Sequence, residues 1–207
     1  NNLRKIDEEN RYYNSFSFYD NNLNLIDSYN KINLVPFGEF LPLEKILSKI
    51  GLKSLSNNYQ SFSSGEKRNI ISLNNNDFDV RILPLICYEI IYSGEIFDDT
   101  NFDFIINISE DGWFGKSIGP HQHFTHRIFR AIESGKYLLR SANNGITAVI
   151  SPVGIVESKI KLGDTGYLDF YEKRVSDITL FSQYGNKMFF VIILLYIFLI
   201  FSFNRIL

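Results

Sequence analysis

Residues 80–90 read VRILPLICYEI, an apolar run that ends at Cys87. A short continuous apolar run is typical of a strand buried on both faces. A second run, FDFIINI at residues 102–108, stops just before Ser109. Residues 88–97 leave room for a short helix between them, which predicts a β-α-β unit with two parallel strands. Because ligands bind beyond the carboxyl ends of such strands, we expect Cys87 and the segment that starts at Ser109 to lie at a site.

The remaining patterns are typical of an α/β domain and show no internal repeat. Pro120 opens a helical pattern that Gly135 ends. The other expected elements are a strand over residues 13–19 with a hairpin turn at 20–22, a short helix at 43–50, a loop over 51–76 with a short strand near 70–73, and strands at 137–141 and 145–150.

Length and composition exclude several classes of protein. The 207 residues predict one domain with a sizeable core. The net charge of −2 comes from 21 basic and 23 acidic residues without a dense basic patch, so nucleic acid is not an expected partner. Cys87 is the only cysteine, so no intrachain disulfide can form and its thiol is free to pack or to react.

The C-terminal segment differs from the rest of the chain. Residues 188–203 read MFFVIILLYIFLIFSF and carry no charge. As a helix this run rises about 24 Å, slightly less than the roughly 30 Å of a bilayer core, but Lys187 and Arg205 could extend to the two interfaces. We therefore predict a catalytic domain over residues 1–186 and a transmembrane helix over residues 187–204. The alternative is a buried core helix, although such a terminal helix usually has one polar face.

Cys87 is a candidate nucleophile because a helix N-terminus stabilises a thiolate. Attack on an ester or amide also needs a group that handles protons and a group that stabilises an oxyanion. Lys31 and Glu39 flank a rigid turn, PFG at residues 36–38, and are the candidates. The residues alone leave two possibilities open for Cys87. It is either a nucleophile or an inert core residue, as a single cysteine often is.

Several motifs together resemble the apolipoprotein N-acyltransferase family of the nitrilase superfamily. They are YNK at 29–31, LVPFGEFLPL at 34–43, ICYE at 86–89, DGWFG at 111–115, GPHQH at 119–123 and NNG at 143–145, in the order and spacing of the family. The resemblance identifies Cys87 as the nucleophile, Lys31 as the triad lysine, and Glu39 and Glu89 as supporting acids. The general-base glutamate of the family lies upstream of the strand near Tyr13 and has no match here.

The resemblance also implies a fold and a function. We expect an α/β, nitrilase-like α-β-β-α sandwich, incomplete at its N-terminus, with one C-terminal transmembrane helix. The expected reaction is ping-pong transfer of an acyl chain from a phospholipid to the N-terminal amine of a diacylglyceryl-cysteine lipoprotein through a thioester. No cofactor is expected. We expect a monomer in the bacterial inner membrane with its catalytic domain on the periplasmic face, and residues 51–76 as a lid toward the lipid.

The other candidate residues have a structural alternative beside the functional one. Tyr88 and His123 are expected to support the substrate site. Trp113 is either a core residue or a loop aromatic near lipid, and Asn143 and Asn144 are expected to form a turn beside the site. The three histidines lie close together at 121, 123 and 126, but no acidic or cysteine ligand accompanies them at a recognisable spacing, so no metal site is expected. Glu110 stands where the family commonly has asparagine.

Two rival functions remain open. A soluble-type carbon-nitrogen hydrolase would cleave an amide with water and would need no membrane segment, so solubility without detergent would favour it. A non-catalytic remnant that binds lipid or a lipoprotein is the other rival, because the general base has no match. An acyl thioester on Cys87 would discriminate between the enzyme and the remnant.

Overall fold

A six-stranded mixed sheet forms the centre of the computed structural model, which describes residues 2–6, 9–43, 61–75, 78–96, 99–171 and 177–203. The strand order is β10-β9-β8-β7-β6-β5. The strands are β5 (Ile71–Asn75), β6 (Phe78–Ile86), β7 (Phe104–Glu110), β8 (Tyr137–Asn143), β9 (Thr147–Ile150) and β10 (Val156–Ile160).

The three central strands are parallel. Ile86 of β6 pairs with Ile108 of β7, and Glu110 of β7 pairs with Asn143 of β8. The carboxyl ends of the three strands therefore meet at one edge of the sheet, as predicted from the two apolar runs. In β6 the side chains from Ile82 to Ile86 are buried on both faces of the sheet, which accounts for the unbroken apolar sequence.

The helix after β6 is shorter than predicted. A 3₁₀ helix, η2 (Cys87–Ile91), takes the place of the expected helix over residues 88–97. It stops because Tyr92 is extended and Gly94 has a φ of 70°. The strand-to-helix junction at Cys87 is confirmed, but the helix has only five residues.

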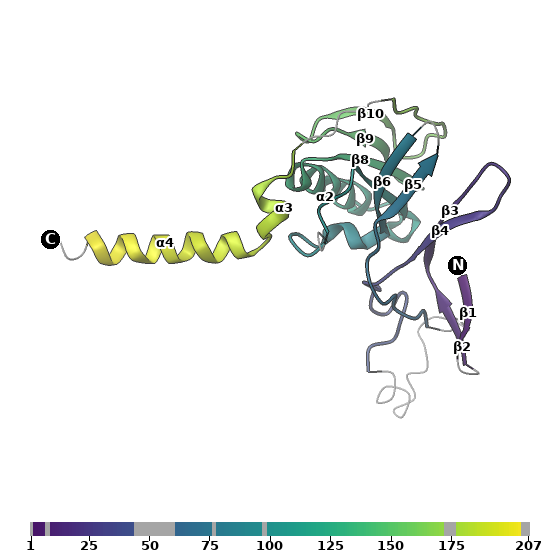
Figure 1. Ribbon diagram of the computed structural model, residues 1–207, viewed down its shortest axis with the longest axis horizontal. Coiled ribbons are helices and arrows are strands. Elements are labelled where there is room, and N and C mark those ends of the chain that lie inside the picture. The colour runs from purple at the N-terminus through teal and green to yellow at the C-terminus, as the bar shows by residue number, and fades with distance from the viewer. Residues whose placement is uncertain are drawn as a thin grey trace.

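The long helix α2 (Gly119–Ser134) covers one face of the sheet (Figure 1). Pro120 lies in its first turn, and Gly135, the residue just beyond its end, has a φ of 66°, the left-handed conformation common at that position. Beneath it lies the main core, in which a fully buried leucine or isoleucine contributes about 2 kcal/mol. The core contains Leu83, Leu85, Ile90, Ile96, Phe102, Ile105, Ala131, Leu138, Ala148 and Ile150.

The opposite side of β6 carries a second, smaller core. The hairpin of β3 (Ser15–Tyr19) and β4 (Leu25–Asn30) supplies Tyr29, which packs with Ile71 and Ile86. This confirms the predicted hairpin. A second antiparallel hairpin, β1 (Asn2–Ile6) with β2 (Glu9–Tyr13), was not predicted, because its sequence is polar and charged.

The segment just before β5 makes backbone hydrogen bonds to other parts of the fold. Residues 61–70 run across the loop that carries Lys31 and Glu39, and β5 confirms the short strand predicted near residue 70. The predicted helix at 43–50 lies outside the described residues apart from Leu43, and residues 51–60 of the predicted lid lie outside them entirely.

At the C-terminal end, α3 (Leu180–Tyr184) packs on α2, and α4 (Lys187–Phe203) points away from the sheet (Figure 1). Over the described ranges, no helix combines the length and the hydropathy that crossing a membrane requires. The predicted transmembrane helix over residues 187–204 is thus not confirmed. The 17 residues of α4 rise about 26 Å, short of the roughly 30 Å of a bilayer core.

The alternative of a buried core helix does not describe α4 either. Its apolar side chains from Phe189 to Phe203 are between 37% and 68% exposed. The fold class is α/β, as predicted. The described residues also form two sheets of two strands each, β1-β2 and β3-β4, and β3 contacts β6.

Candidate active site

Cys87 lies at the junction of β6 and η2 and is partly exposed. Its φ is 51°, a left-handed backbone conformation that a residue with a side chain adopts only at a cost in energy. The Sγ atom lies 3.9 Å from the carbonyl oxygen of Glu110, at the end of the neighbouring strand. This geometry places the thiol at the carboxyl edge of the parallel strands, as predicted.

Lys31 and Glu39 form a buried ion pair. The Lys31 Nζ lies 2.7 Å from the Glu39 Oε2, and Lys31 is 1% exposed. Glu39 also accepts from the backbone N–H of Val35 at 2.7 Å and from the Asn14 amide at 2.8 Å. Lys31 is therefore not a solvated surface residue, and its ammonium is held in one direction by a carboxylate that is itself fixed.

Glu89 joins the Lys31 loop to the nucleophile element. Its Oε1 accepts from the Tyr29 hydroxyl at 2.5 Å and from the backbone N–H groups of Ile32 and Asn33 at 3.1 and 3.2 Å, while its Oε2 accepts from Ile86 N–H at 2.8 Å. Burial and the nearby Glu89 carboxylate raise the pKa of Tyr29. The side chain that follows Cys87 by two residues thus fixes the loop that carries Lys31.

Residues 61–69 brace the same loop from outside, a contact that the sequence did not predict. Gly65 N–H donates to the Lys31 carbonyl at 2.8 Å, and a Cβ on Gly65 would lie only 2.2 Å from the Asn30 carbonyl oxygen. Arg68 reaches the Glu89 Oε1 at 3.4 Å. Residues 61–69 thus pack on the loop that carries Lys31, and the lid over residues 51–76 stays a prediction.

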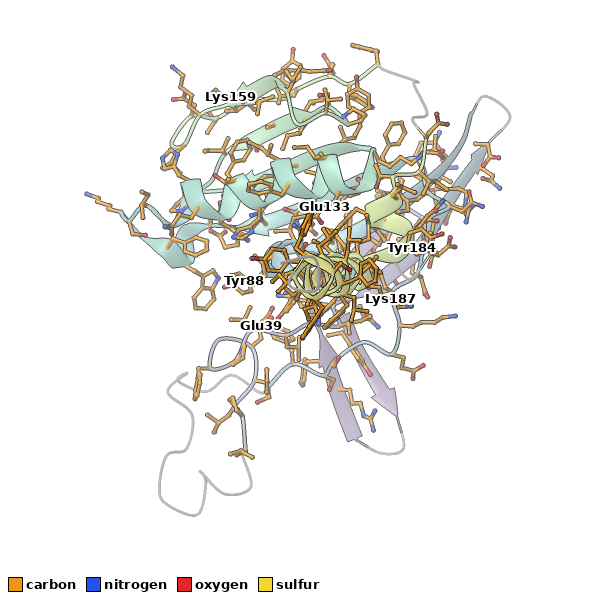
Figure 2. All side chains as sticks on the ribbon, turned by 90° about the vertical axis from the view of Figure 1, so that its left-hand side faces the viewer. Glu39, Tyr88, Glu133, Lys159, Tyr184 and Lys187 are labelled. Atoms are coloured by element: carbon orange, nitrogen blue, oxygen red, sulfur yellow. The ribbon has the colours of Figure 1, made fainter. Side chains whose placement is uncertain are left out.

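Tyr88 and His123 meet beside the nucleophile. Their rings stack with centroids 5.8 Å apart, and the centroid of the Phe114 ring lies 5.1 Å from that of His123. In the view of Figure 2, the labels of Tyr88 and Glu39 lie near each other, to the left of α4, which is seen end-on. His123 Nδ1 is 2.9 Å from Asp111, and Arg127 donates to His123 Nε2 at 2.8 Å, an arrangement that fits a neutral imidazole.

Burial lowers the pKa of His123 to about 4, although the hydrogen bond to Asp111 opposes the shift. An unfolded histidine titrates near 6.5, so between about pH 6.5 and 4 the unfolded chain binds more protons than the folded one. Stability is therefore lost as the pH falls through this window. We expect His123→Gln to remove about 2 kcal/mol of the loss in unfolding free energy between pH 7 and pH 5, measured by urea unfolding.

The matched control for this prediction is His121→Gln, because His121 lies on the same helix and is exposed. It should keep the pH dependence of the unmodified protein. Equal slopes for His123→Gln and the unmodified protein would contradict a buried neutral His123.

The remaining candidates surround the end of β7. Trp113 is 79% exposed and is therefore not a core residue. Asn144 has a φ of 51° and forms the turn after β8, as predicted. Asn143 and Asn144 both donate to the Glu110 carboxylate, which also accepts from Gly112 N–H at 2.6 Å. Glu110 thus organises this loop through its side chain.

Neither the cavities nor the possible metal ligands help to locate the site. A cavity of about 600 Å³ is lined by Asn143 and Asn144 together with Leu139 and Tyr167, but Cys87, Lys31 and Glu39 do not line it. We therefore assign the site from Cys87 and its partners, because the cavity contains none of the candidate catalytic side chains. Among the described residues, no group of three or more histidine, cysteine, aspartate or glutamate side chains could hold a metal ion.

A sequence model described as carbon-nitrogen hydrolase matches residues 2–168, which include every residue of the site above. The chain belongs to the carbon-nitrogen hydrolase family.

Curated relatives of this carbon-nitrogen hydrolase are named apolipoprotein N-acyltransferase, which confirms the resemblance seen in the motifs. The protein of that name from Rhodopseudomonas palustris is 43% identical over 160 residues, covering 77% of this chain and 29% of the relative. That from Wigglesworthia glossinidia brevipalpis is 39% identical over 198 residues, covering 90% and 38%. The chain thus spans about a third of the length of these relatives.

Among solved structures, an amidase from Nesterenkonia sp. is similar over 72% of this chain and 51% of the amidase, with 16% identity and a TM-score of 0.47. A likeness at this level supports no conclusion about the reaction or the substrate.

Proposed function

We propose that this chain carries the catalytic site of a membrane acyltransferase, which moves an acyl chain from a phospholipid to the N-terminal amine of a diacylglyceryl-cysteine lipoprotein. The observation that carries the proposal is the buried Lys31–Glu39 pair, tied through Glu89 to the element that begins with Cys87. The names of the relatives support the same acceptor.

In the first half-reaction the Cys87 thiol loses its proton and its Sγ attacks the ester carbonyl carbon of the phospholipid. The carbonyl oxygen becomes an oxyanion that the Lys31 ammonium and backbone N–H groups stabilise. Collapse of this tetrahedral intermediate breaks the ester C–O bond, and the lysophospholipid leaves as an alcohol after it takes up a proton. An acyl thioester on Cys87 remains. The glutamate that accepts the thiol proton in the family has no match in this sequence.

In the second half-reaction the acceptor amine attacks the thioester carbonyl. The C–S bond breaks, the amine loses one proton as the amide forms, and Cys87 returns to its starting state. Glu39 holds Lys31 in both steps. A lysine suits this role because its ammonium is a compact charge. Tyr88 and the exposed Trp113 are assigned to contact with the acyl chain, beside the positioned His123.

Both substrates carry acyl chains, and each CH₂ withdrawn from a bilayer into water costs about 0.8 kcal/mol, which favours an enzyme that works at the membrane. We assign residues 1–186 to the catalytic domain and residues 187–204 to the segment that enters the lipid. Support comes from the apolar side chains of α4, which are exposed on every face. By resemblance, the protein is a monomer of the bacterial inner membrane with the site on the periplasmic face.

The experiment that tests the proposal supplies the intact protein in detergent micelles with a phospholipid labelled in one acyl chain and a diacylglyceryl-cysteine peptide. The expected product is the labelled amide at the peptide N-terminus, together with lysophospholipid. A peptide with an acetylated N-terminus is the control and should receive no label. Labelled fatty acid without amide would instead favour the hydrolase. If neither product forms, the non-catalytic remnant is the only reading left.

A further inference from the structure

Arg127 is a fully buried arginine in the middle of α2, and its exposed fraction is 0%. A buried guanidinium needs partners for its donors, because an unpaired buried charge is costly. Arg127 donates through Nε to the Asn107 Oδ1 at 2.9 Å and through Nη2 to the carbonyl oxygen of Cys87 at 3.4 Å. It also donates to the His123 carbonyl and to the His123 ring.

Asn107 makes the same contact from the neighbouring strand. Its amide nitrogen donates to the carbonyl oxygens of Leu85 at 3.1 Å and of Cys87 at 3.4 Å, and its exposed fraction is 0%. Two buried donors, one from α2 and one from β7, therefore converge on the carbonyl of the nucleophile. This carbonyl belongs to the residue whose φ of 51° is strained.

We propose that Arg127 is a positioning residue that, with Asn107, holds the Cys87 carbonyl and so keeps the thiol aimed at the acyl carbon. The inference rests on the proposed function. A strained conformation persists only where its surroundings over-determine it, and the two donors on one carbonyl supply that constraint. If they release it, Cys87 relaxes toward a negative φ, and its Sγ leaves the direction set by the end of β6.

The partners of Arg127 explain why this position suits an arginine. Its planar fork can donate to Asn107, Cys87 and His123 in fixed directions, whereas a lysine ammonium is a single flexible point. His123 is in turn fixed by Asp111, which pairs with the buried Arg140. Although burial opposes it, the hydrogen bond from His123 and the charge of Arg140 lower the pKa of Asp111. The clamp on Cys87 is therefore part of one buried network.

Arg130 provides a matched control on the same helix. It is also buried, at 3% exposed, but it pairs with Glu133 at 2.5 Å and donates to the carbonyl of Ile91 at the far end of η2, not to that of Cys87. We would compare Arg127→Met with Arg130→Met, and Arg127→Lys with Arg130→Lys, in the intact protein. The lysine pair keeps the charge and most of the side-chain volume, so it serves if a methionine variant does not fold.

The first measurement is the rate at which iodoacetamide alkylates Cys87, together with the melting temperature of each variant. At a similar loss of melting temperature, the Arg127 variants should react about 10- to 100-fold more slowly than the unmodified protein, and the Arg130 variants within about 2-fold of it. In the transfer assay kcat should fall by a similar factor while KM for the phospholipid stays unchanged. Equal alkylation rates in folded Arg127 and Arg130 variants would overturn the proposal.

Iodoacetamide needs no lipid site, so the two proposals can fail separately. Fast alkylation of the unmodified protein, with no acyl transfer under any condition, would refute the proposed function. The comparison of Arg127 with Arg130 variants would still decide the positioning role.

Discussion

Replacing Lys31 with methionine should lower the rate of thioester formation by about 10²- to 10³-fold, the loss typical when one oxyanion donor is removed. The ammonium is 1% exposed and fixed by Glu39 at 2.7 Å, so little water is at hand to replace it. Methionine keeps the length and the apolar stem of the side chain. The measurement is single-turnover release of lysophospholipid from a labelled phospholipid, with binding of the phospholipid measured separately.

Lys136→Met is the control for this variant, because Lys136 is likewise buried, at 4% exposed, but lies at the start of β8 and belongs to no part of the site. It should form the thioester at a rate close to that of the unmodified protein. A Lys31→Met protein that is folded and reacts at the unmodified rate would remove Lys31 from the mechanism.

Glu89→Gln should reduce both stability and activity. Both carboxylate oxygens accept from backbone N–H groups, Oε1 from Ile32 and Asn33 and Oε2 from Ile86. A glutamine has one acceptor oxygen, so its NH₂ must face at least one of these N–H groups. An unpaired buried donor costs about 1–3 kcal/mol, and we expect the free energy of unfolding in urea to fall by about 2 kcal/mol.

Thioester formation should fall as well, because the loop with Lys31 is no longer fixed to η2. Glu66→Gln is the control, since Glu66 is exposed and should change the unfolding free energy by less than about 0.5 kcal/mol. If Glu89→Gln were as stable and as active as Glu66→Gln, Glu89 would not be the link between the two elements.

The strongest local patterns predicted the elements that build the sheet. The apolar runs that end at Cys87 and before Ser109 gave two parallel strands with adjacent ends, and Pro120 and Gly135 predicted the bounds of α2 within one residue. These predictions succeed because burial on both faces and helix termini have local sequence signatures. Lys31 and Glu39 were candidates because they flank the turn at residues 36–38, and the resemblance then strengthened their assignment as partners of Cys87.

Contacts between distant segments were not predicted. Arg68 comes from a polar stretch without periodicity, and its contact with Glu89 depends on how residues 61–69 cross the Lys31 loop. Arg127 had a weak signal, because it shares the inward face of α2 with His123 and Ala131, four residues to either side. A charged residue on such a face indicates a buried polar network. The partners of Arg127 could not be predicted, because Asn107 on β7 and the Cys87 carbonyl reach it only through the tertiary fold.

The predicted membrane helix shows a different limit of sequence-based prediction. Residues 188–203 are apolar without interruption, and hydropathy alone predicted a span. Over the described residues α4 rises about 26 Å, and the span predicted for residues 187–204 is not confirmed. The apolar surface of α4 is consistent with a segment in contact with lipid, which remains part of the proposed function.

The chemical state of Cys87 during turnover tests the account most directly. The intact protein would be incubated with a phospholipid of one defined acyl chain and no acceptor amine, then digested, and the mass of the peptide that contains Cys87 measured. The account predicts an added acyl group that hydroxylamine removes and that is absent from Cys87→Ala. Release of lysophospholipid with no acyl group on Cys87, or the same release by Cys87→Ala, would contradict it.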